Sequence, residues 1–212
     1  MHIADGVLPP QVAIAGYALT GGVTWYCLRK INKETNPQEN IPKASLLTAA
    51  FFVASLIHIP LPPTSIHLIL NGMMGAILGY YSFPAILIGL FFQAVMFGHG
   101  GLSTLGINAA MMGIPALFAY HIFNLRHLLG KKRQFSTGIF AFLAGAGALA
   151  ISATIFTVVV ITNISADIDV EMEKMAIYTS MIGYSFQALI EGAFTVMLVF
   201  FIERVKPELL ES

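Results

Sequence analysis

The sequence has little charge and almost no cysteine. Of its 212 residues, 10% are Asp, Glu, Lys or Arg, whereas 57% are hydrophobic. A single cysteine, Cys27, excludes an internal disulfide framework and a paired-cysteine zinc site. Any metal ion bound by this chain must therefore be held by nitrogen or oxygen atoms.

Long apolar runs take the place of the missing charge. A helix needs about 20 mostly apolar residues to cross a bilayer. Gly, Pro and charged residues divide this sequence into seven apolar runs, of which the fourth is short for a full crossing. They cover approximately residues 11–30, 43–59, 65–82, 84–97, 103–124, 134–163 and 174–203. We predict an all-α integral membrane protein in which residues 1–212 form one transmembrane domain of seven helices, preceded by residues 1–10.

The basic residues predict the orientation of these helices, because cytoplasmic loops collect Lys and Arg. Ten of the 11 basic residues form three clusters. These are Arg29, Lys30, Lys33 and Lys43; Arg126, Lys131, Lys132 and Arg133; and Arg204 and Lys206. All three clusters fall on one side if there are seven crossings but not if there are six. The N-terminus is therefore predicted outside and the C-terminus inside.

The first ten residues lack the basic region of a cleavable signal peptide, so we expect the N-terminus to be retained. The α-amine of Met1, the amide nitrogen of His2 and its Nδ1 can then close fused five- and six-membered rings on one metal ion. Nitrogen donors in a plane suit Ni(II) and Cu(II). The alternative is that His2 is an incidental second residue in a flexible end, which is the commoner case for such short motifs.

The loops predicted on the same side as the N-terminus contain further histidines. His67 follows a stiff, proline-rich connection and is expected at the start of a helix, where it could supply a fourth nitrogen. His58 and His99 flank the outer mouth as entry or auxiliary ligands, or simply as loop histidines bonded to the backbone. The sequence favours the second interpretation.

Three motifs taken together resemble the CbiM/NikM family, the substrate-binding membrane components of energy-coupling-factor (ECF) transporters for cobalt and nickel. They are MHIADG at residues 1–6, PPTSIHL at 62–68 and FGHGGLSTLGIN at 97–108. The resemblance implies that an extra first helix threads the N-terminus into a six-helix bundle. It also implies a square-planar metal site formed by the Met1 amine, the amide and Nδ1 nitrogens of His2, and His67.

The resemblance further implies partners in the plasma membrane of a prokaryote: a transmembrane coupling subunit and two ATPase subunits. Ala50 and Ala54 match an Ala-xxx-Ala docking pattern for the coupling subunit, although such spacing equally serves packing within a bundle. The chain ends soon after the seventh predicted helix, so a small extra membrane subunit is expected to replace the domain fused to longer members, or none does. No nucleic-acid partner and no cofactor are expected; lipid surrounds the chain.

The expected geometry narrows the choice of transported ion. Planar nitrogen donors favour Ni(II) and Cu(II) and serve tetrahedral Zn(II) poorly. Between the nickel and cobalt that the resemblance implies, we expect Ni(II), with Co(II) as second choice. Polar residues near the ligands in the sequence are expected to orient them or balance their charge. These candidates are Asp5, Thr64, Ser65, Asn71 and Asn108.

Enzyme functions find no support in the motifs, since there is neither an HExxH zinc motif nor a phosphate-binding loop. The rival function is a stand-alone metal carrier driven by an ion gradient. Glu191, one turn after Gln187 and well inside a predicted helix, would be its proton relay. A hydrogen-bonded strut between helices explains Glu191 equally well, and the sequence shows no convincing internal repeat of the kind common in carriers.

Overall fold

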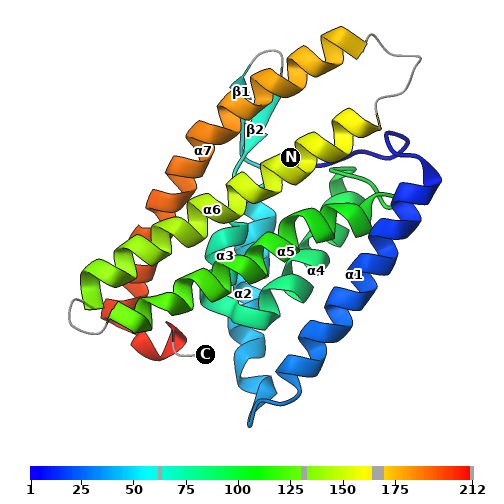
Figure 1. Cartoon of the computed structure of the whole chain (residues 1–212). Coiled ribbons are helices and arrows are strands. Elements are labelled where there is room, and N and C mark those ends of the chain that lie inside the picture. The colour runs from blue at the N-terminus through cyan, green and yellow to red at the C-terminus, as the bar shows by residue number, and fades with distance from the viewer. Residues whose placement is uncertain (62–63, 130–132, 164–169, 211–212) are drawn as a thin grey trace.

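The computed structural model describes residues 1–61, 64–129, 133–163 and 170–210, without the side chains of 58–61, 64–66, 129, 133, 170, 172 and 173. Helices dominate these described residues (Figure 1). The α-helices are α1 (Pro10–Ile31), α2 (Ile41–Ala54), α3 (Asn71–Leu78), α4 (Ser82–Phe97), α5 (Leu105–Asn124), α6 (Arg133–Thr162) and α7 (Val170–Val205). Short 3-10 helices are η1 (Pro37–Asn40), η2 (Gly79–Tyr81), η3 (Leu125–Leu129) and η4 (Pro207–Leu210).

Four segments of the described chain are long and apolar enough to cross a membrane. They are Asn71–Phe97, which contains α3, η2 and α4, then Leu105–Leu128, Gln134–Thr162 and Lys174–Val205. Large apolar side chains lie on the outer surface, among them Trp25, Phe186 and Phe201, each at least 60% exposed. A water-soluble protein would bury such groups, so the chain is an α-helical membrane protein.

A β-hairpin stands where the sequence suggested the ends of two helices. The expected helices 43–59 and 65–82 are wrong at this junction, because α2 ends at Ala54 and α3 begins at Asn71. Between them, β1 (His58–Leu61) pairs antiparallel with β2 (Thr64–His67). Pro60 cannot donate a helical hydrogen bond, and β-branched residues favour an extended backbone. His67 consequently ends a strand, opposite His58, rather than starting a helix.

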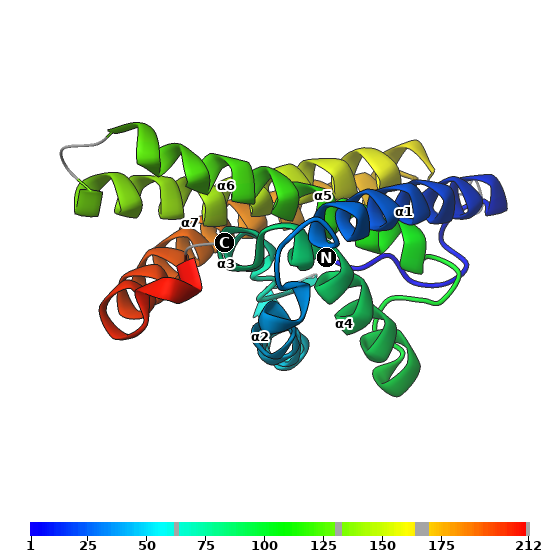
Figure 2. The same cartoon turned by 90° about the horizontal axis from the view of Figure 1, so that it is seen from below.

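The helices pack in two layers, and α3 is buried. Figure 2 shows α1, α5 and α6 in one row, with α2, α3 and α4 on one side of it. Every residue of α3 is buried. In the row, α5 contacts α1 closely at Gly106, where an added Cβ would lie 2.5 Å from the backbone nitrogen of Tyr17. The hydroxyl of Thr20 donates to the carbonyl of Gly106 at 2.6 Å, fixing this crossing.

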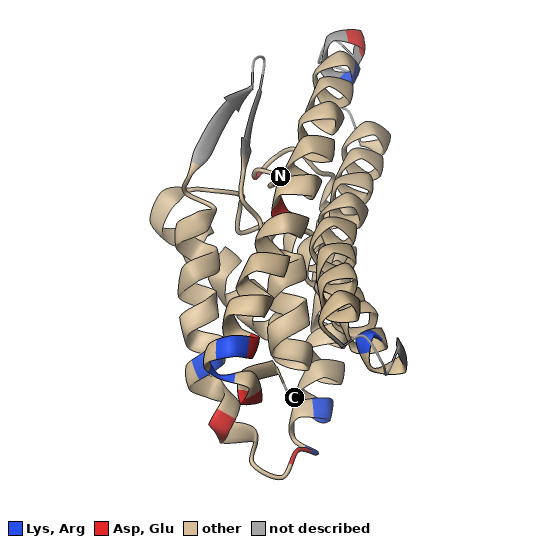
Figure 3. Cartoon of the chain, turned by 90° about the vertical axis from the view of Figure 1, so that its left-hand side faces the viewer, with Lys and Arg blue, Asp and Glu red and all other residues tan. Residues whose placement is uncertain are grey.

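Lys and Arg gather at the end of the bundle that holds the α1–α2 connection and the C-terminus (Figure 3). Lys43 Nζ, near the start of α2, donates to the carbonyl of Leu209 at 3.2 Å. Arg126, in η3, donates to the carbonyl of Leu210 at 2.9 Å. The described parts of the three basic clusters therefore share one end, while Lys131 and Lys132 lie outside the described residues.

Candidate metal centre

The segment ahead of α1 runs into the bundle instead of trailing from it. Met1 is 4% exposed and Ile3 is 2% exposed. Asn108, near the start of α5, holds the backbone of Ile3 in both directions: the Ile3 N–H donates to Oδ1 at 2.9 Å, and Nδ2 donates to the Ile3 carbonyl at 2.9 Å. The Thr104 hydroxyl donates to the same carbonyl at 2.6 Å. These bonds fix the position of Met1 and His2.

The first two residues meet His67 inside the bundle. The α-amine of Met1 donates to Nε2 of His67 at 2.7 Å. Nδ1 of His2 lies 3.0 Å from the same Nε2 atom. On its other side, Nδ1 of His67 donates to the carbonyl of Leu68 at 3.3 Å. The structure thus brings together Met1, His2 and His67, the three residues predicted to bind metal.

His99, on the loop after α4, completes a histidine cluster. The nearest potential ligand atoms of His2, His67 and His99 all lie within 4.8 Å of one another. The ring centroid of His99 lies 4.2 Å from that of His2 and 5.1 Å from that of His67. His58 pairs with His67 through the hairpin backbone, but its side chain lies outside the description. Of the two auxiliary candidates, His99 is the one placed at the cluster.

Gln93, on α4, was missed by the sequence analysis. Its Oε1 accepts a hydrogen bond from Nε2 of His2 at 3.0 Å. Its Nε2 donates to the hydroxyl of Ser55 at 2.6 Å, which fixes which end of the amide faces His2. A neutral imidazole carries one N–H, so this bond leaves the lone pair on Nδ1. The available signal was a single amide in the otherwise apolar run 84–97.

Burial changes the acid–base behaviour of the N-terminal amine. It lowers the pKa of the Met1 α-amine from 8.0 to about 5, with the carboxylate of Glu191 opposing part of the shift. The amine is therefore neutral at pH 7 and can bind a metal without first losing a proton. Since the unfolded chain binds this proton more tightly, the contribution of Met1 to the free energy of folding becomes less favourable as pH falls from 8 towards 5.

Asp5 anchors the loop that carries His99. Its carboxylate accepts hydrogen bonds from the hydroxyl of Ser103 at 2.5 Å, the N–H of Ser103 at 2.8 Å and the N–H of Leu102 at 3.2 Å. The bond from the Ser103 hydroxyl is the main cause of the lowered pKa of Asp5. Asp5 is exposed, and its hydrogen bonds join the N-terminal segment to the loop between α4 and α5.

The remaining polar candidates take other places. Asn71 begins α3, and its Nδ2 donates to the carbonyl of Met112 and to the hydroxyl of Ser152, each at 2.9 Å. These bonds connect α3 with α5 and α6. Thr64 and Ser65 lie in β2 with side chains outside the description. Among the candidates whose side chains the structure describes, Asn108 and Asp5 hold the N-terminal segment.

Gly101→Ala is expected to weaken metal binding about tenfold or more, the lower end of the effect of changing groups that orient a metal ligand. A Cβ at Gly101 would lie 2.2 Å from Oδ1 and 2.6 Å from the backbone nitrogen of Asp5, so loop and N-terminal segment would have to separate. Gly147→Ala is the control, because nothing lies within 4 Å of its added Cβ. Metal titration of both purified variants checks this; equal affinities would contradict it.

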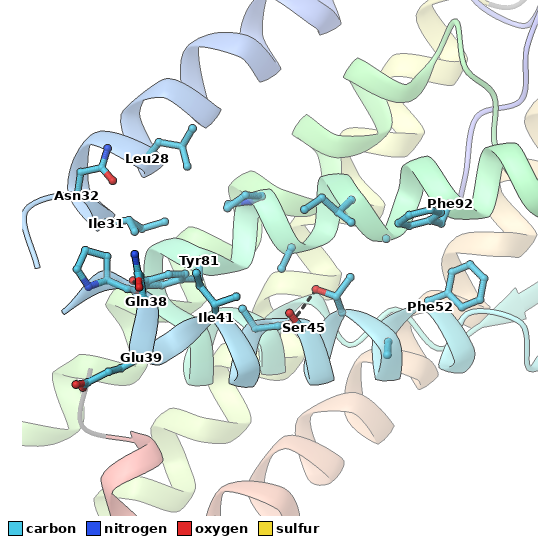
Figure 4. Close-up of a pocket in the computed structure, with 18 of the residues that line it drawn as sticks. Leu28, Ile31, Asn32, Gln38, Glu39, Ile41, Ser45, Phe52, Tyr81 and Phe92 are labelled. Carbon is cyan, nitrogen blue, oxygen red and sulfur yellow. Dashed lines mark hydrogen bonds between the residues drawn. The ribbon is translucent and has the colours of Figure 1, made fainter.

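A groove of about 1170 Å³ lies elsewhere, between α1, η1, α2 and α4 (Figure 4). Its wall is largely apolar and includes Ala49, Phe52 and Phe92. Ala50 is exposed and Ala54 is half-buried on the same α2 helix. Neither Ala50 nor Ala54 lines this groove, which is separate from the histidine cluster.

Comparison with known proteins identifies the family. Residues 2–209 match the model of the CbiM family, described as the cobalt uptake substrate-specific transmembrane region. A Haemophilus influenzae protein named for metal transport is 40% identical over 155 residues, 71% of this chain and 73% of that protein. A fused nickel transport protein, NikMN of Rhodobacter capsulatus, is 30% identical over 161 residues, 73% of this chain but 46% of the relative.

The fold agrees with a solved membrane transporter. A crystal structure of a truncated transition metal transporter superposes with a TM-score of 0.77 at 23% identity, covering 96% of this chain and 99% of the other. At that identity the likeness concerns the fold. The family match extends over nearly the whole chain and includes the N-terminal segment from His2 onwards. This chain is a member of the CbiM family of cobalt and nickel transport proteins.

Proposed function

We propose that this chain is the substrate-binding subunit of an ATP-driven ECF importer for Ni(II), with Co(II) as the second choice. It captures the ion from the outer face and has no catalytic activity of its own. One observation carries the proposal: the Met1 amine and Nδ1 of His2 both approach Nε2 of His67, at 2.7 and 3.0 Å. Family membership supports transport as the purpose of such a cluster.

The distances favour planar coordination. With metal–nitrogen bonds of about 2.0 Å, neighbouring donors lie about 2.8 Å apart in a square plane and about 3.3 Å apart in a tetrahedron. The observed separations of 2.7 and 3.0 Å are closer to the square. In the fused chelate, the amine and Nδ1 occupy opposite corners around the His2 amide. The fourth donor must then be adjacent to both, as Nε2 of His67 is.

Hydrogen bonds on the far sides of the imidazoles support the same arrangement. The Nε2–H of His2 points to Gln93, and the Nδ1–H of His67 points to Leu68. These bonds direct the remaining lone pairs, on Nδ1 of His2 and Nε2 of His67, towards each other across 3.0 Å. In the metal-free site the Met1 amine donates a hydrogen bond to Nε2 of His67, and a cation bound in place of that hydrogen would attract both imidazole lone pairs.

His99 is proposed as the entry or auxiliary ligand. Its ring lies against both other histidines, on the loop that Asp5 fastens to the N-terminal segment. An ion arriving from outside would meet His99 first and then enter the plane. Because the plane is complete with four nitrogens, His99 affects entry more than final affinity.

Delivery requires partners. We propose that a transmembrane coupling subunit docks along α2 at Ala50, which is exposed, and Ala54, which is half-buried. Two ATPase subunits then drive transport. The basic end of the bundle faces the cytoplasm of a prokaryotic cell, because Lys and Arg collect there.

The rival function, a stand-alone carrier, uses Glu191 as a proton relay. The carboxylate of Glu191 instead accepts hydrogen bonds from the N–H groups of Ile69 and Leu70 at 2.6 and 2.9 Å, which supports a structural role. Uptake of nickel by vesicles containing this chain alone would favour the carrier. We expect uptake only when coupling and ATPase subunits are present and ATP is supplied.

Metal-dependent thermal stabilisation tests the ion preference. A ligand at 100 times its Kd stabilises the folded state by about 2.7 kcal/mol. At equal metal concentration, we expect Ni(II) to raise Tm more than Co(II), and Zn(II) least of the three, because the site is planar. A largest shift with Zn(II) would contradict the proposed geometry.

A further inference from the structure

Glu191 and Gln187 lie one turn apart near the middle of α7, and both are buried, at 1% and 2% exposed. A carboxylate in such a place is costly unless its charge is balanced and hydrogen-bonded. Neither residue is one of the proposed metal ligands. Their role must therefore be inferred from the groups with which they form hydrogen bonds.

The partners are the backbone groups that follow His67. Glu191 accepts from the N–H groups of Ile69 and Leu70 at 2.6 and 2.9 Å. Gln187 Nε2 donates to the carbonyl of His67 at 2.6 Å and to Oε1 of Glu191 at 2.8 Å. The pair therefore forms hydrogen bonds with three backbone groups where the chain passes from β2 to α3. Held there, Nε2 of His67 can remain beside Met1 and His2.

The segment that receives these hydrogen bonds, residues 67–70, also has an unusual backbone conformation. Leu70 has φ of 56°, in the left-handed region that non-glycine residues rarely adopt. Its N–H donates to Glu191 while it stands just ahead of α3. The turn that lets the strand ending at His67 enter α3 therefore depends on an acceptor from α7.

Glu191 also offers charge. Its two oxygens accept three N–H groups in all, the pattern of an ionised carboxylate, which only accepts. It favours the charged form of the Met1 α-amine over the neutral one, so the carboxylate lies near enough to the site to stabilise a positive charge there. A divalent ion bound by one deprotonated amide and three neutral nitrogens keeps one net positive charge. A nearby buried carboxylate neutralises that remainder.

We propose that Glu191 is a positioning and charge-balancing residue of the metal centre, acting with Gln187 on the His67 backbone. It is not a metal ligand. The inference rests on the proposed nickel site and explains why α7, far from the N-terminus in sequence, contributes a buried carboxylate to it.

The test compares Glu191→Gln with Glu203→Gln in the purified full chain. Both changes remove one carboxylate from α7, but Glu203 lies in the last turn of the helix, next to Arg204. Titration with Ni(II), followed by visible absorption, is expected to show a 10- to 100-fold weaker affinity and an altered spectrum for Glu191→Gln, the range found when groups that orient metal ligands are changed. Glu203→Gln should match the unaltered protein in both measurements.

Two further variants separate position from charge. Gln187→Leu removes the bond to the His67 carbonyl without changing charge, so we expect a smaller loss of affinity than for Glu191→Gln. Glu191→Asp keeps the charge and should recover part of the affinity. If Glu191→Gln does not fold, Glu191→Asp and Gln187→Leu decide the matter. Weaker nickel affinity than in the unaltered protein supports the inference, and unaltered affinity in both variants overturns it.

The outcomes are distinct from those of the functional proposal. Unchanged nickel affinity and spectrum in folded Glu191→Gln would overturn the inference while leaving the nickel site in place. Equal losses in Glu191→Gln and Glu203→Gln would also overturn it, because the effect would then be general electrostatics. Failure of the unaltered protein to bind nickel would instead refute the proposed function.

Discussion

Placing one alanine ahead of Met1 is expected to abolish high-affinity nickel binding at the site that includes His67, while leaving the fold intact. The extension converts the Met1 amine into a peptide nitrogen and moves the new amine one residue away. The five-membered ring can then no longer form between the N-terminus and the His2 amide. Met1 is 4% exposed, so the added residue must also displace the segment held by Asn108 and Thr104.

Loss of affinity by more than about 100-fold is expected, beyond the 10- to 100-fold effect of altering a group that only orients a ligand. Adding one alanine at the C-terminal end is the matched control and should change nothing. The mass of each intact protein establishes which N-terminus is present. The new Ala-Met-His end could chelate Ni(II) by itself through its amine, two amides and the imidazole, so the extension is also combined with His67→Ala. Undiminished affinity of the verified extension that still depends on His67 would show that the Met1 amine is not a ligand.

His67→Ala is expected to have the second largest effect. It removes the nitrogen that lies beside both the amine and Nδ1 of His2, so the plane loses its fourth donor. We expect nickel affinity to fall by more than about 100-fold, equivalent to more than about 2.7 kcal/mol, and the visible spectrum to change. Calorimetric titration and absorption spectroscopy of the same samples measure both.

His99→Ala is the control for this substitution, since it removes the same kind of ring from the same cluster. It should slow metal uptake by the site but keep the planar spectrum. Comparable losses of equilibrium affinity in the two variants would show that the His99 nitrogen also belongs to the coordination plane. An unchanged spectrum in His67→Ala would remove His67 from the site.

Local chemistry in the sequence was enough to propose the first half of the candidate site. Met1 and His2 can form a chelate by covalent connectivity alone, so their role could be proposed without any knowledge of the fold. Hydrophobic periodicity and charge likewise placed helices near α1, α4, α5, α6 and α7, whose observed bounds lie close to the expected ranges. These features depend on neighbouring residues, and a sequence displays them directly.

Features set by distant contacts were not predictable in this way. The β-hairpin replaced the expected helix at His67 because His58–Leu61 pair with Thr64–His67 rather than continuing α2 or α3. Gln93 gave no sign that its amide meets His2, since that contact depends on how α4 packs against the N-terminal segment. Glu191 was correctly singled out as unusual, but its hold on Ile69 and Leu70 could be found only in three dimensions.

Nickel X-ray absorption of the purified, metal-loaded chain tests the central claim most directly, because coordination geometry distinguishes the possible donor sets. The proposed site predicts one Ni(II) per chain with four nitrogen neighbours in a plane, two of them imidazoles. A six-coordinate ion surrounded mainly by oxygen, or a sulfur neighbour from the methionines, would contradict it.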